Sequence, residues 1–213
     1  MAALKTPDGF RIERGLLWPD YDRRCAEVVF DWEPDIDVAL AHVKKFGCVV
    51  QAGGNCGVWP INLAKRFDRV LTFEPDPMNF TALAFNTAHL KNVVRVQAAL
   101  GVTSNLVGME EPERENCGAL RVGAGGLLPT LPLDLFAFVA LDLLMLDVEG
   151  SELFALHGAL KSIEKFRPVI VVEDKGLSDH YGYKKGDIEA WLAREFGYEV
   201  VARPHRDVVL VPR

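Results

Sequence analysis

The sequence of 213 residues contains no long hydrophobic run, no excess of basic residues and few cysteines. A membrane-spanning helix needs about 18 or more apolar residues in a row, and no such run occurs. Residues 1–10 have no apolar core of signal-peptide length, so we expect a cytoplasmic protein with no membrane partner. The formal net charge of −6 and the absence of a short basic cluster argue against nucleic acid as a partner.

The four cysteines are Cys25, Cys48, Cys56 and Cys117. They form no Cys-x-x-Cys pair, and no histidine stands near them at zinc-finger spacing. Cysteines in this arrangement are typically reduced and buried in a cytoplasmic protein. We therefore predict free thiols, mostly in the interior.

The composition is that of one folded α/β domain, with 49% hydrophobic and 25% charged residues. Short apolar runs alternate with segments of helical periodicity, and this rhythm indicates a parallel sheet with helices on both faces. The expected strands are 48–52, 69–73, 93–98, 141–146 and 168–172. The expected helices are 35–46, 58–67, 78–90, 151–166 and 187–196.

The C-terminal part departs from this rhythm. Two apolar runs, 198–202 and 208–211, are separated by only five residues, Arg203-Pro204-His205-Arg206-Asp207. A parallel crossover needs a longer connection, so the two runs are expected to form an antiparallel hairpin. The last strand of the sheet is therefore predicted to be reversed.

Residues 100–131 match no regular pattern and include the glycine-rich stretch Gly123-Ala124-Gly125-Gly126. An insertion at this point lies near the ligand-binding edge of a parallel sheet, so it is a candidate for part of a substrate wall. A solvated excursion fits its length equally well.

The most informative segment is the turn Gly53-Gly54-Asn55-Cys56-Gly57, which joins an apolar strand to a helix. Glycines here allow positive φ and close backbone approach to a ligand, and Glu74 at the end of the next strand is placed to accept both hydroxyls of a ribose. The dinucleotide pattern Gly-x-Gly-x-x-Gly and the Gly-Lys-Ser/Thr phosphate loop are both missing. These features favour S-adenosylmethionine, which has no phosphate, although the glycines alone would also fit a purely structural turn.

Four segments together resemble one known family. They are Gly53–Gly57, Thr72–Phe80, Leu146–Glu152 with the block Asp-Val-Glu-Gly-Ser-Glu, and Arg167–Glu173. They are similar to the FkbM-type S-adenosylmethionine-dependent methyltransferases. The resemblance implies a class I methyltransferase fold, a Rossmann-like three-layer sandwich around a mostly parallel seven-stranded sheet of order 3-2-1-4-5-7-6 with a reversed C-terminal strand. It also implies an enzyme that O-methylates a sugar, a glycan or a small natural product.

Within this fold, residues 48–213 are expected to form the S-adenosylmethionine-binding domain, and residues 1–47 an N-terminal cap of the same domain that includes the aromatic residues Trp18, Tyr21, Phe30 and Trp32. The family usually has an acid where this chain has Gln51, whose amide oxygen would accept from the cofactor's ammonium group without the charge. Asp147 is expected to supply that charge. The predicted cofactor-binding residues are Gln51, Gly53, Asn55, Cys56, Gly57, Glu74, Pro75, Ala98, Ala99 and Asp147.

Methyl transfer to a hydroxyl benefits from a general base near the carboxyl ends of the fourth and fifth strands. The predicted catalytic residues are Asp147, Glu173 and His180. Each also has a plain structural interpretation: Asp147 as a helix cap, Glu173 as a buried acid paired with Lys175 or an arginine, and His180 as a solvated loop residue. Asp147 and Asp174 together would suit Mg²⁺, but we favour a reaction without a metal.

Two other functions stay open. A nucleic-acid methyltransferase would carry an Asn/Asp-Pro-Pro-aromatic signature after the fourth strand, where this chain has Asp147-Val148-Glu149-Gly150. A protein that kept the fold but lost the reaction is supported only by Gln51. The acceptor, whether small molecule or glycan, would be chosen by residues 1–33, 100–131 and 176–186, and a homo-oligomer is possible.

Overall fold

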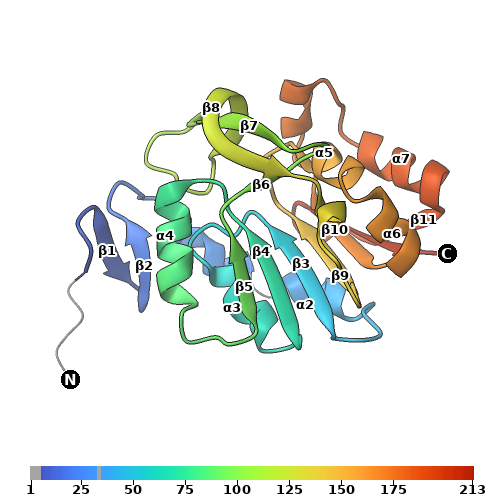
Figure 1. Ribbon diagram of the computed structural model, residues 1–213, viewed down its shortest axis with the longest axis horizontal. Coiled ribbons are helices and arrows are strands. Elements are labelled where there is room, and N and C mark those ends of the chain that lie inside the picture. The colour runs from blue at the N-terminus through green and yellow to red at the C-terminus, as the bar shows by residue number, and fades with distance from the viewer. Residues whose placement is uncertain (1–5, 33–34) are drawn as a thin grey trace.

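The computed structural model describes residues 6–32 and 35–213 and contains a central sheet of seven strands (Figure 1). Its order is β5-β4-β3-β9-β10-β12-β11. The strands are β3 (Cys48–Ala52), β4 (Arg69–Phe73), β5 (Val93–Val96), β9 (Leu143–Leu146), β10 (Val169–Glu173), β11 (Tyr198–Ala202) and β12 (Asp207–Pro212). The pairs among β5, β4, β3, β9 and β10 are parallel, whereas β12 pairs antiparallel with both β10 and β11. The predicted strand order and the reversed last strand are confirmed.

Helices cover both faces of this sheet because its central strands are apolar on both sides. Side chains such as Val50 and Ala52 pack on one face against α5 (Glu152–His157), α6 (Leu160–Phe166) and α7 (Asp187–Phe196). The alternate side chains, such as Val49, pack on the other face against α2 (Asp35–Leu40) and α3 (Val58–Ala64). The three-layer sandwich is therefore present as predicted.

The N-terminal segment forms a small unit beside α4 (Pro77–Asn86), at the left of Figure 1. It consists of the antiparallel hairpin β1 (Phe10–Glu13) and β2 (Leu16–Pro19), the helix α1 (Cys25–Val28) and the 3₁₀ turn η1 (Val29–Trp32). Trp18 is fully buried and packs edge-to-face with Phe30, with the two ring centroids 6.3 Å apart. Asn86 of α4 holds β2 in place, since its side chain pairs with both the N–H and the C=O of Leu17. Of the predicted cap, residues 1–5, residues 33–34 and the side chain of Trp32 lie outside the described part.

The expectation that residues 100–131 lack regular structure is wrong. They form most of a second sheet of β6 (Ala99–Leu100), β8 (Arg121–Leu131) and β7 (Asn105–Glu110), seen at the top of Figure 1. The glycines hid these strands because glycine has low strand propensity. They are required by a close crossing of β7 and β8: a Cβ on Gly108 would lie 2.1 Å from the carbonyl oxygen of Gly125, and one on Gly126 would lie 2.3 Å from that of Val107.

The single helix predicted over 151–166 is also wrong, because the chain breaks into α5 and α6 at Gly158. A Cβ on Gly158 would lie 2.0 Å from the carbonyl oxygen of Gly101 in the neighbouring segment. The new helix α6 is capped from a distance by Asp134, which sits in the 3₁₀ turn η2 (Leu133–Leu135) and accepts from the N–H groups of Lys161 and Ser162. This tertiary contact has no signal in the local sequence.

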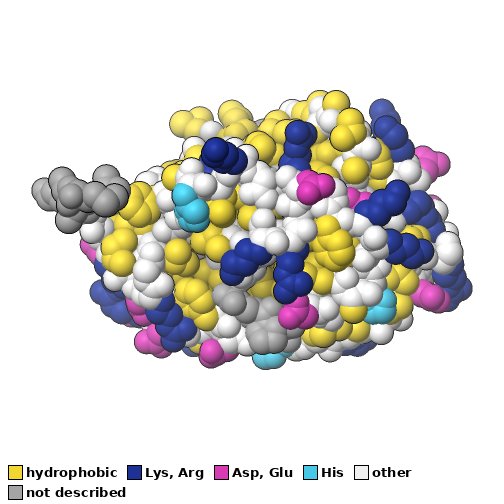
Figure 2. Space-filling view, turned by 90° about the horizontal axis from the view of Figure 1, so that it is seen from below, with side chains coloured by type: hydrophobic (Ala, Val, Ile, Leu, Met, Phe, Trp, Pro, Cys, Tyr) yellow, Lys and Arg dark blue, Asp and Glu magenta, His cyan; other side chains and the backbone are white. Residues whose placement is uncertain are grey.

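Across the described residues, no helix combines the length and the apolar character that crossing a bilayer would require. Figure 2 shows one face of the molecule, on which Lys and Arg side chains are spread among hydrophobic and acidic ones and are not gathered into one patch.

Candidate active site

A cavity of about 650 Å³ opens at the carboxyl ends of β3, β4, β9 and β10. The second sheet and the loop between β7 and β8 form one wall of it, and α1 closes another side. The carboxyl edge of a parallel sheet is the usual binding edge of such folds, and this volume suits a ligand of cofactor size.

Most of the predicted cofactor residues line this cavity. They are Gly53, Asn55, Glu74, Pro75, Ala98, Ala99 and Asp147, and the predicted catalytic residue Glu173 lines it as well. The structure does not bring Gln51, Cys56, Gly57 or His180 to the lining.

The glycine turn is built for a close approach of two strand ends. Gly53 has φ +85°, and a Cβ on it would lie 1.8 Å from the carbonyl oxygen of Asp147. A Cβ on Gly54 would lie 2.7 Å from Oγ1 of Thr72. The first two glycines therefore allow β3 to pass against β9 and β4, and this packing brings the turn and Asp147 to the same wall.

Glu74 is buried at the floor of the cavity with 5% of its surface exposed. Its Oε2 accepts from the N–H of Asn55 at 2.7 Å, and its Oε1 accepts from the N–H of Asp76 at 2.9 Å. Burial raises the pKa of Glu74 to about 8, while the two backbone N–H donors oppose that rise. A carboxylate oxygen has two lone pairs, so both oxygens retain capacity for further hydroxyl donors.

Gln51 lies elsewhere than predicted. Alternation along β3 points Ala52 toward the cavity and Gln51 toward the opposite face of the sheet. There the side chain is fully buried, its Oε1 accepts from Oγ1 of Thr72 at 2.6 Å, and its Nε2 donates to the carbonyl of Gly53 at 2.8 Å. Gln51 thus supports the glycine turn from behind.

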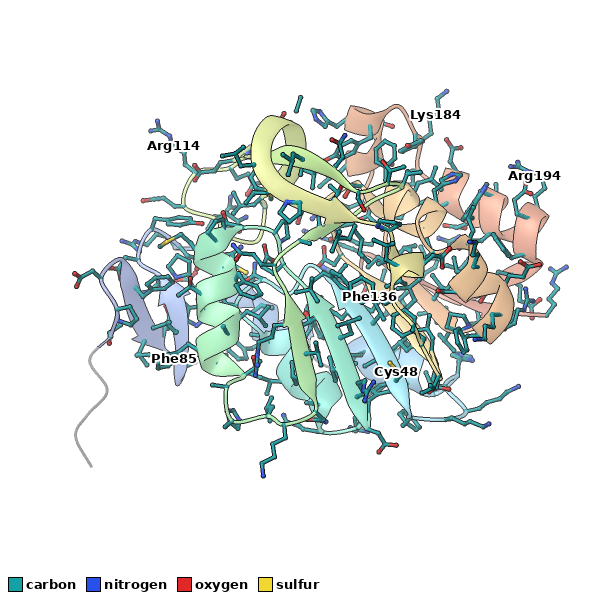
Figure 3. All side chains as sticks on the ribbon, viewed as in Figure 1. Cys48, Phe85, Arg114, Phe136, Lys184 and Arg194 are labelled. Atoms are coloured by element: carbon teal, nitrogen blue, oxygen red, sulfur yellow. The ribbon has the colours of Figure 1, made fainter. Side chains whose placement is uncertain are left out.

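The cysteines are free thiols, as predicted, and three of them are buried while Cys25 is half-buried. Cys56 is buried in a cluster with Leu17 and Trp18, and Gly57 is the N-cap of α3 with φ +99°. Cys25 and Cys117 line the cavity. Cys48 lies at the far end of the sheet, remote from the loop that carries Arg114 (Figure 3). Burial raises the pKa of Cys48 to about 11 and also raises that of Cys56.

The strongest electrostatic feature of the cavity is a set of three acids, Asp147, Glu149 and Glu173, called here the acid cluster. One carboxylate oxygen from each lies within 4.8 Å of the others. Lys175 bridges two of them, with its Nζ 2.9 Å from Oε1 of Glu149 and 2.8 Å from Oε2 of Glu173. The structural interpretation of Glu173 as an acid paired with Lys175 is confirmed.

Crowding of like charges in a partly dry site changes the ionisation of these groups. Burial first, and the neighbouring Asp147 second, raise the pKa of Glu173 to about 9 and that of Glu149 to about 7. Burial also raises the pKa of Asp147, although Lys175, a hydrogen bond with Glu173 and Arg206 counteract it. The acid cluster therefore has more affinity for protons, and for cations, than separate carboxylates have.

Two other acids at these strand ends have structural roles. Glu152 accepts from the N–H groups of Val148 and Gly150 and so closes the turn before α5. Asp174 accepts from the N–H of Gly186, at the start of α7. Asp174 does not line the cavity that Asp147 lines. The cation seated at the acid cluster is the ammonium group of Lys175.

The expectation for His180 is not met. His180 lies in the 3₁₀ helix η3 (Leu177–Tyr181), is 39% exposed, and has its Nε2 3.6 Å from Oε2 of Glu110. Its neighbour Tyr181 donates to the carbonyl of Val122 at 2.7 Å and fastens this helix to the second sheet. The segment reaches the cavity through Leu177 instead.

Several lining residues carried no interpretable signal in the sequence. They are Arg24, Val28 and Val29 from the N-terminal unit, Met109, Arg121 and Val122 from the second sheet, and Arg206 from the turn between β11 and β12. Glu149 and Lys175 do stand at the predicted strand ends, but only the tertiary structure joins them to Asp147.

Comparison with known proteins agrees with this geometry. The sequence model of the family described as "Methyltransferase FkbM domain" matches residues 52–200. No curated protein sequence matches the chain.

Three solved structures illustrate the likeness in fold. A methyltransferase FkbM from Methylobacillus flagellatus KT is 19% identical, with a TM-score of 0.54 over 92% of this chain, which spans only 56% of that protein. A proposed methyltransferase from Streptococcus mutans in complex with SAH is 9% identical, with a TM-score of 0.54 over 85% of this chain and 97% of that one. A rRNA methylase from Streptococcus thermophilus is 13% identical, with a TM-score of 0.50 over 84% of this chain and 94% of that one. At these identities the likeness shows the class I methyltransferase fold.

Proposed function

The chain belongs to the FkbM methyltransferase family, and we propose that it transfers a methyl group from S-adenosylmethionine to a hydroxyl of a sugar, a glycan or a small natural product. The observation that carries this proposal is the cavity at the carboxyl edge of the sheet, which has Glu74 at its floor and the acid cluster on its wall. The cavity fits a cofactor with a ribose, no phosphate and positive charge.

We place the cofactor by the chemistry of the lining. The small side chains of Ala98 and Ala99 leave room for an adenine ring, and Glu74 offers its free lone pairs to the ribose hydroxyls. Asp147, at the end of β9, is proposed to face the ammonium group of the methionine part. Asp147 would supply the negative charge that Gln51 lacks. An acid at position 51 would not reach the ligand, because that side chain lies on the opposite face of the sheet from the cavity.

S-adenosylmethionine supplies an electrophilic methyl group on a sulfonium, so the acceptor oxygen forms the new O–C bond while the C–S electron pair passes to sulfur. The protein's part is to align the acceptor and to take its proton. We propose that Glu173 is the base, because its carboxyl group lies in the acid cluster beside Asp147 and lines the cavity. His180 is not proposed as the base.

The competing functions find less support. A relic that had lost its ligand would be expected to fill the crevice with its own side chains, whereas about 650 Å³ is open. A nucleic-acid methyltransferase would need a basic surface leading to the cavity. The acid cluster on the wall of this cavity instead repels phosphate. The lining suits a carbohydrate acceptor better. Its carboxylates can accept hydrogen bonds from sugar hydroxyls, and Met109 and Val122 offer aliphatic surface to the sugar ring.

The test combines calorimetry with transfer of a tritiated methyl group. We expect S-adenosylmethionine to bind the wild-type protein, and transfer to occur to one or more members of a panel of methyl glycosides but not to an rRNA fragment. Glu173→Gln should keep cofactor binding and reduce transfer by about 100-fold or more, whereas Glu164→Gln, on the exposed side of α6, should change neither. Absence of cofactor binding, or transfer to rRNA alone, would contradict the proposal.

A further inference from the structure

The charges in the acid cluster do not cancel, because three carboxyl groups share one ammonium group. Asp147 follows β9, Glu173 ends β10, and Glu149 approaches from the turn after β9. Lys175 contacts Glu149 and Glu173. If all three acids were ionised, these four groups would carry a net charge of −2 in a largely buried wall, which is unfavourable at a low effective dielectric constant.

The geometry indicates how part of this charge is removed. Carboxylate oxygens of Asp147 and Glu173 lie within 4.8 Å of each other, and one from Glu149 lies equally near. Two ionised carboxylates at this separation in a largely buried wall repel each other, so one proton bound between them stabilises the pair. Among the other charged groups near the acid cluster, Glu149 and Glu113 add to the repulsion, and the cations Lys175 and Arg206 reduce it.

The proposed ligand brings its own positive charge to the same wall. S-adenosylmethionine carries an ammonium, a sulfonium and a carboxylate, and therefore a net charge of +1. A cation placed beside a carboxyl pair favours its ionised form and competes with the shared proton.

We propose that Asp147 and Glu173 share one proton in the cofactor-free protein and release it to solvent when S-adenosylmethionine binds, so that cofactor binding itself ionises the base. This inference rests on the proposed function and adds an order of events. Methyl transfer from a sulfonium to an alcohol releases one proton overall. Here that proton leaves at the binding step, and Glu173 then takes the proton of the acceptor hydroxyl. The acceptor therefore meets an ionised base only after the cofactor is in place.

The experiment is calorimetry of the wild-type protein at about pH 7.5 in buffers that differ in ionisation enthalpy, because the dependence of the binding heat on that enthalpy gives the protons released. Three ligands are compared: S-adenosylmethionine, S-adenosylhomocysteine, which lacks the sulfonium charge, and 5′-methylthioadenosine, which lacks every charge of the methionine part. All three carry the ribose, so any proton lost from Glu74 is common to them. We expect S-adenosylmethionine to release about 0.5–1 proton more than 5′-methylthioadenosine, with S-adenosylhomocysteine between them.

Glu173→Gln removes the acid partner of Asp147 and should reduce this excess to near zero while the cofactor still binds. The matched control Glu164→Gln should leave it unchanged. Equal proton release for S-adenosylmethionine and 5′-methylthioadenosine in the wild type would overturn the inference, and so would an undiminished excess in Glu173→Gln. Absence of binding by S-adenosylmethionine would instead contradict the proposed function, so the two failures are distinct. The wild-type comparison decides the question even if the variant does not fold.

Discussion

Single residues in this site are constrained by packing before they are constrained by the ligand. Gly53 is the clearest example, because its position combines a positive φ with contact to the backbone of Asp147. Gly176 has nearly the same φ, +87°, but nothing lies within 4 Å of the Cβ that it lacks. A substitution at Gly176 therefore tests backbone strain alone, whereas one at Gly53 tests strain together with steric overlap.

We predict that Gly53→Ala destabilises the protein by about 3 kcal/mol or more, because either β3 or β9 must move. Gly176→Ala should cost only roughly 1–2 kcal/mol, the strain of a left-handed backbone. Chemical denaturation of the two variants measures both values. Equal losses would show that the close approach to Asp147 does not constrain the turn.

The role proposed for Glu74 leads to a second prediction. Glu74→Gln keeps the size of the side chain but replaces one carboxyl oxygen, which can accept from backbone N–H groups and ribose hydroxyls, with an amide NH₂ group that can only donate. We expect the free energy of cofactor binding to weaken by about 1.5–3 kcal/mol, measured by calorimetry with S-adenosylmethionine. Glu195→Gln, exposed at the end of α7, is the control and should bind normally. Unchanged affinity in Glu74→Gln would remove Glu74 from the site.

Among the elements, α1 and the loop between β7 and β8 are joined through one buried acid. Asp22 is fully buried and accepts from the N–H groups of Cys25, Ala26 and Cys117. The first two belong to α1, and the third belongs to the loop that forms a cavity wall. The wall therefore depends on the N-terminal unit.

Asp22→Ala should lower the free energy of unfolding by at least about 1.5–3 kcal/mol, because it leaves buried N–H groups without an acceptor. It should also hasten tryptic cleavage after Arg114, which projects from that loop (Figure 3). The exposed neighbour Asp20 provides the control Asp20→Ala, for which neither change is expected. An unaltered cleavage rate in Asp22→Ala would show that the loop is held by other contacts.

At the scale of the whole molecule, the buried acids predict an unusual dependence of stability on pH. Burial raises the pKa of Glu149 to about 7, that of Glu74 to about 8 and that of Glu173 to about 9. In the unfolded chain the pKa of each of these groups is about 4.3, so the folded state binds more protons than the unfolded state between that pH and the raised pKa of each group. Their stabilising contribution is complete below the unfolded pKa and is lost as the pH rises through the folded values.

We therefore expect the melting temperature of the cofactor-free protein to fall between about pH 5 and pH 9. Glu173→Gln should make this fall less steep, because one of the raised groups no longer titrates. Differential scanning calorimetry at several pH values measures both slopes. A melting temperature that rises over this range would contradict the ionisation described for the acid cluster.

Much of this molecule follows from local sequence. The alternation of apolar strands and amphipathic helices, the short hairpin linker Arg203–Asp207 and the turn Gly53–Gly57 predict the layers, the reversed strand and the binding edge, because each depends on residues adjacent in the chain. Only the tertiary structure decided that Gln51 faces away from the cavity and that His180 lies outside it. It also decided that β7 and β8 cross closely at glycines. It further decided that Lys175 contacts Glu149 in addition to Glu173, its expected partner, beside Asp147. These outcomes depend on strand facing and on contacts between distant segments, which local periodicity does not encode.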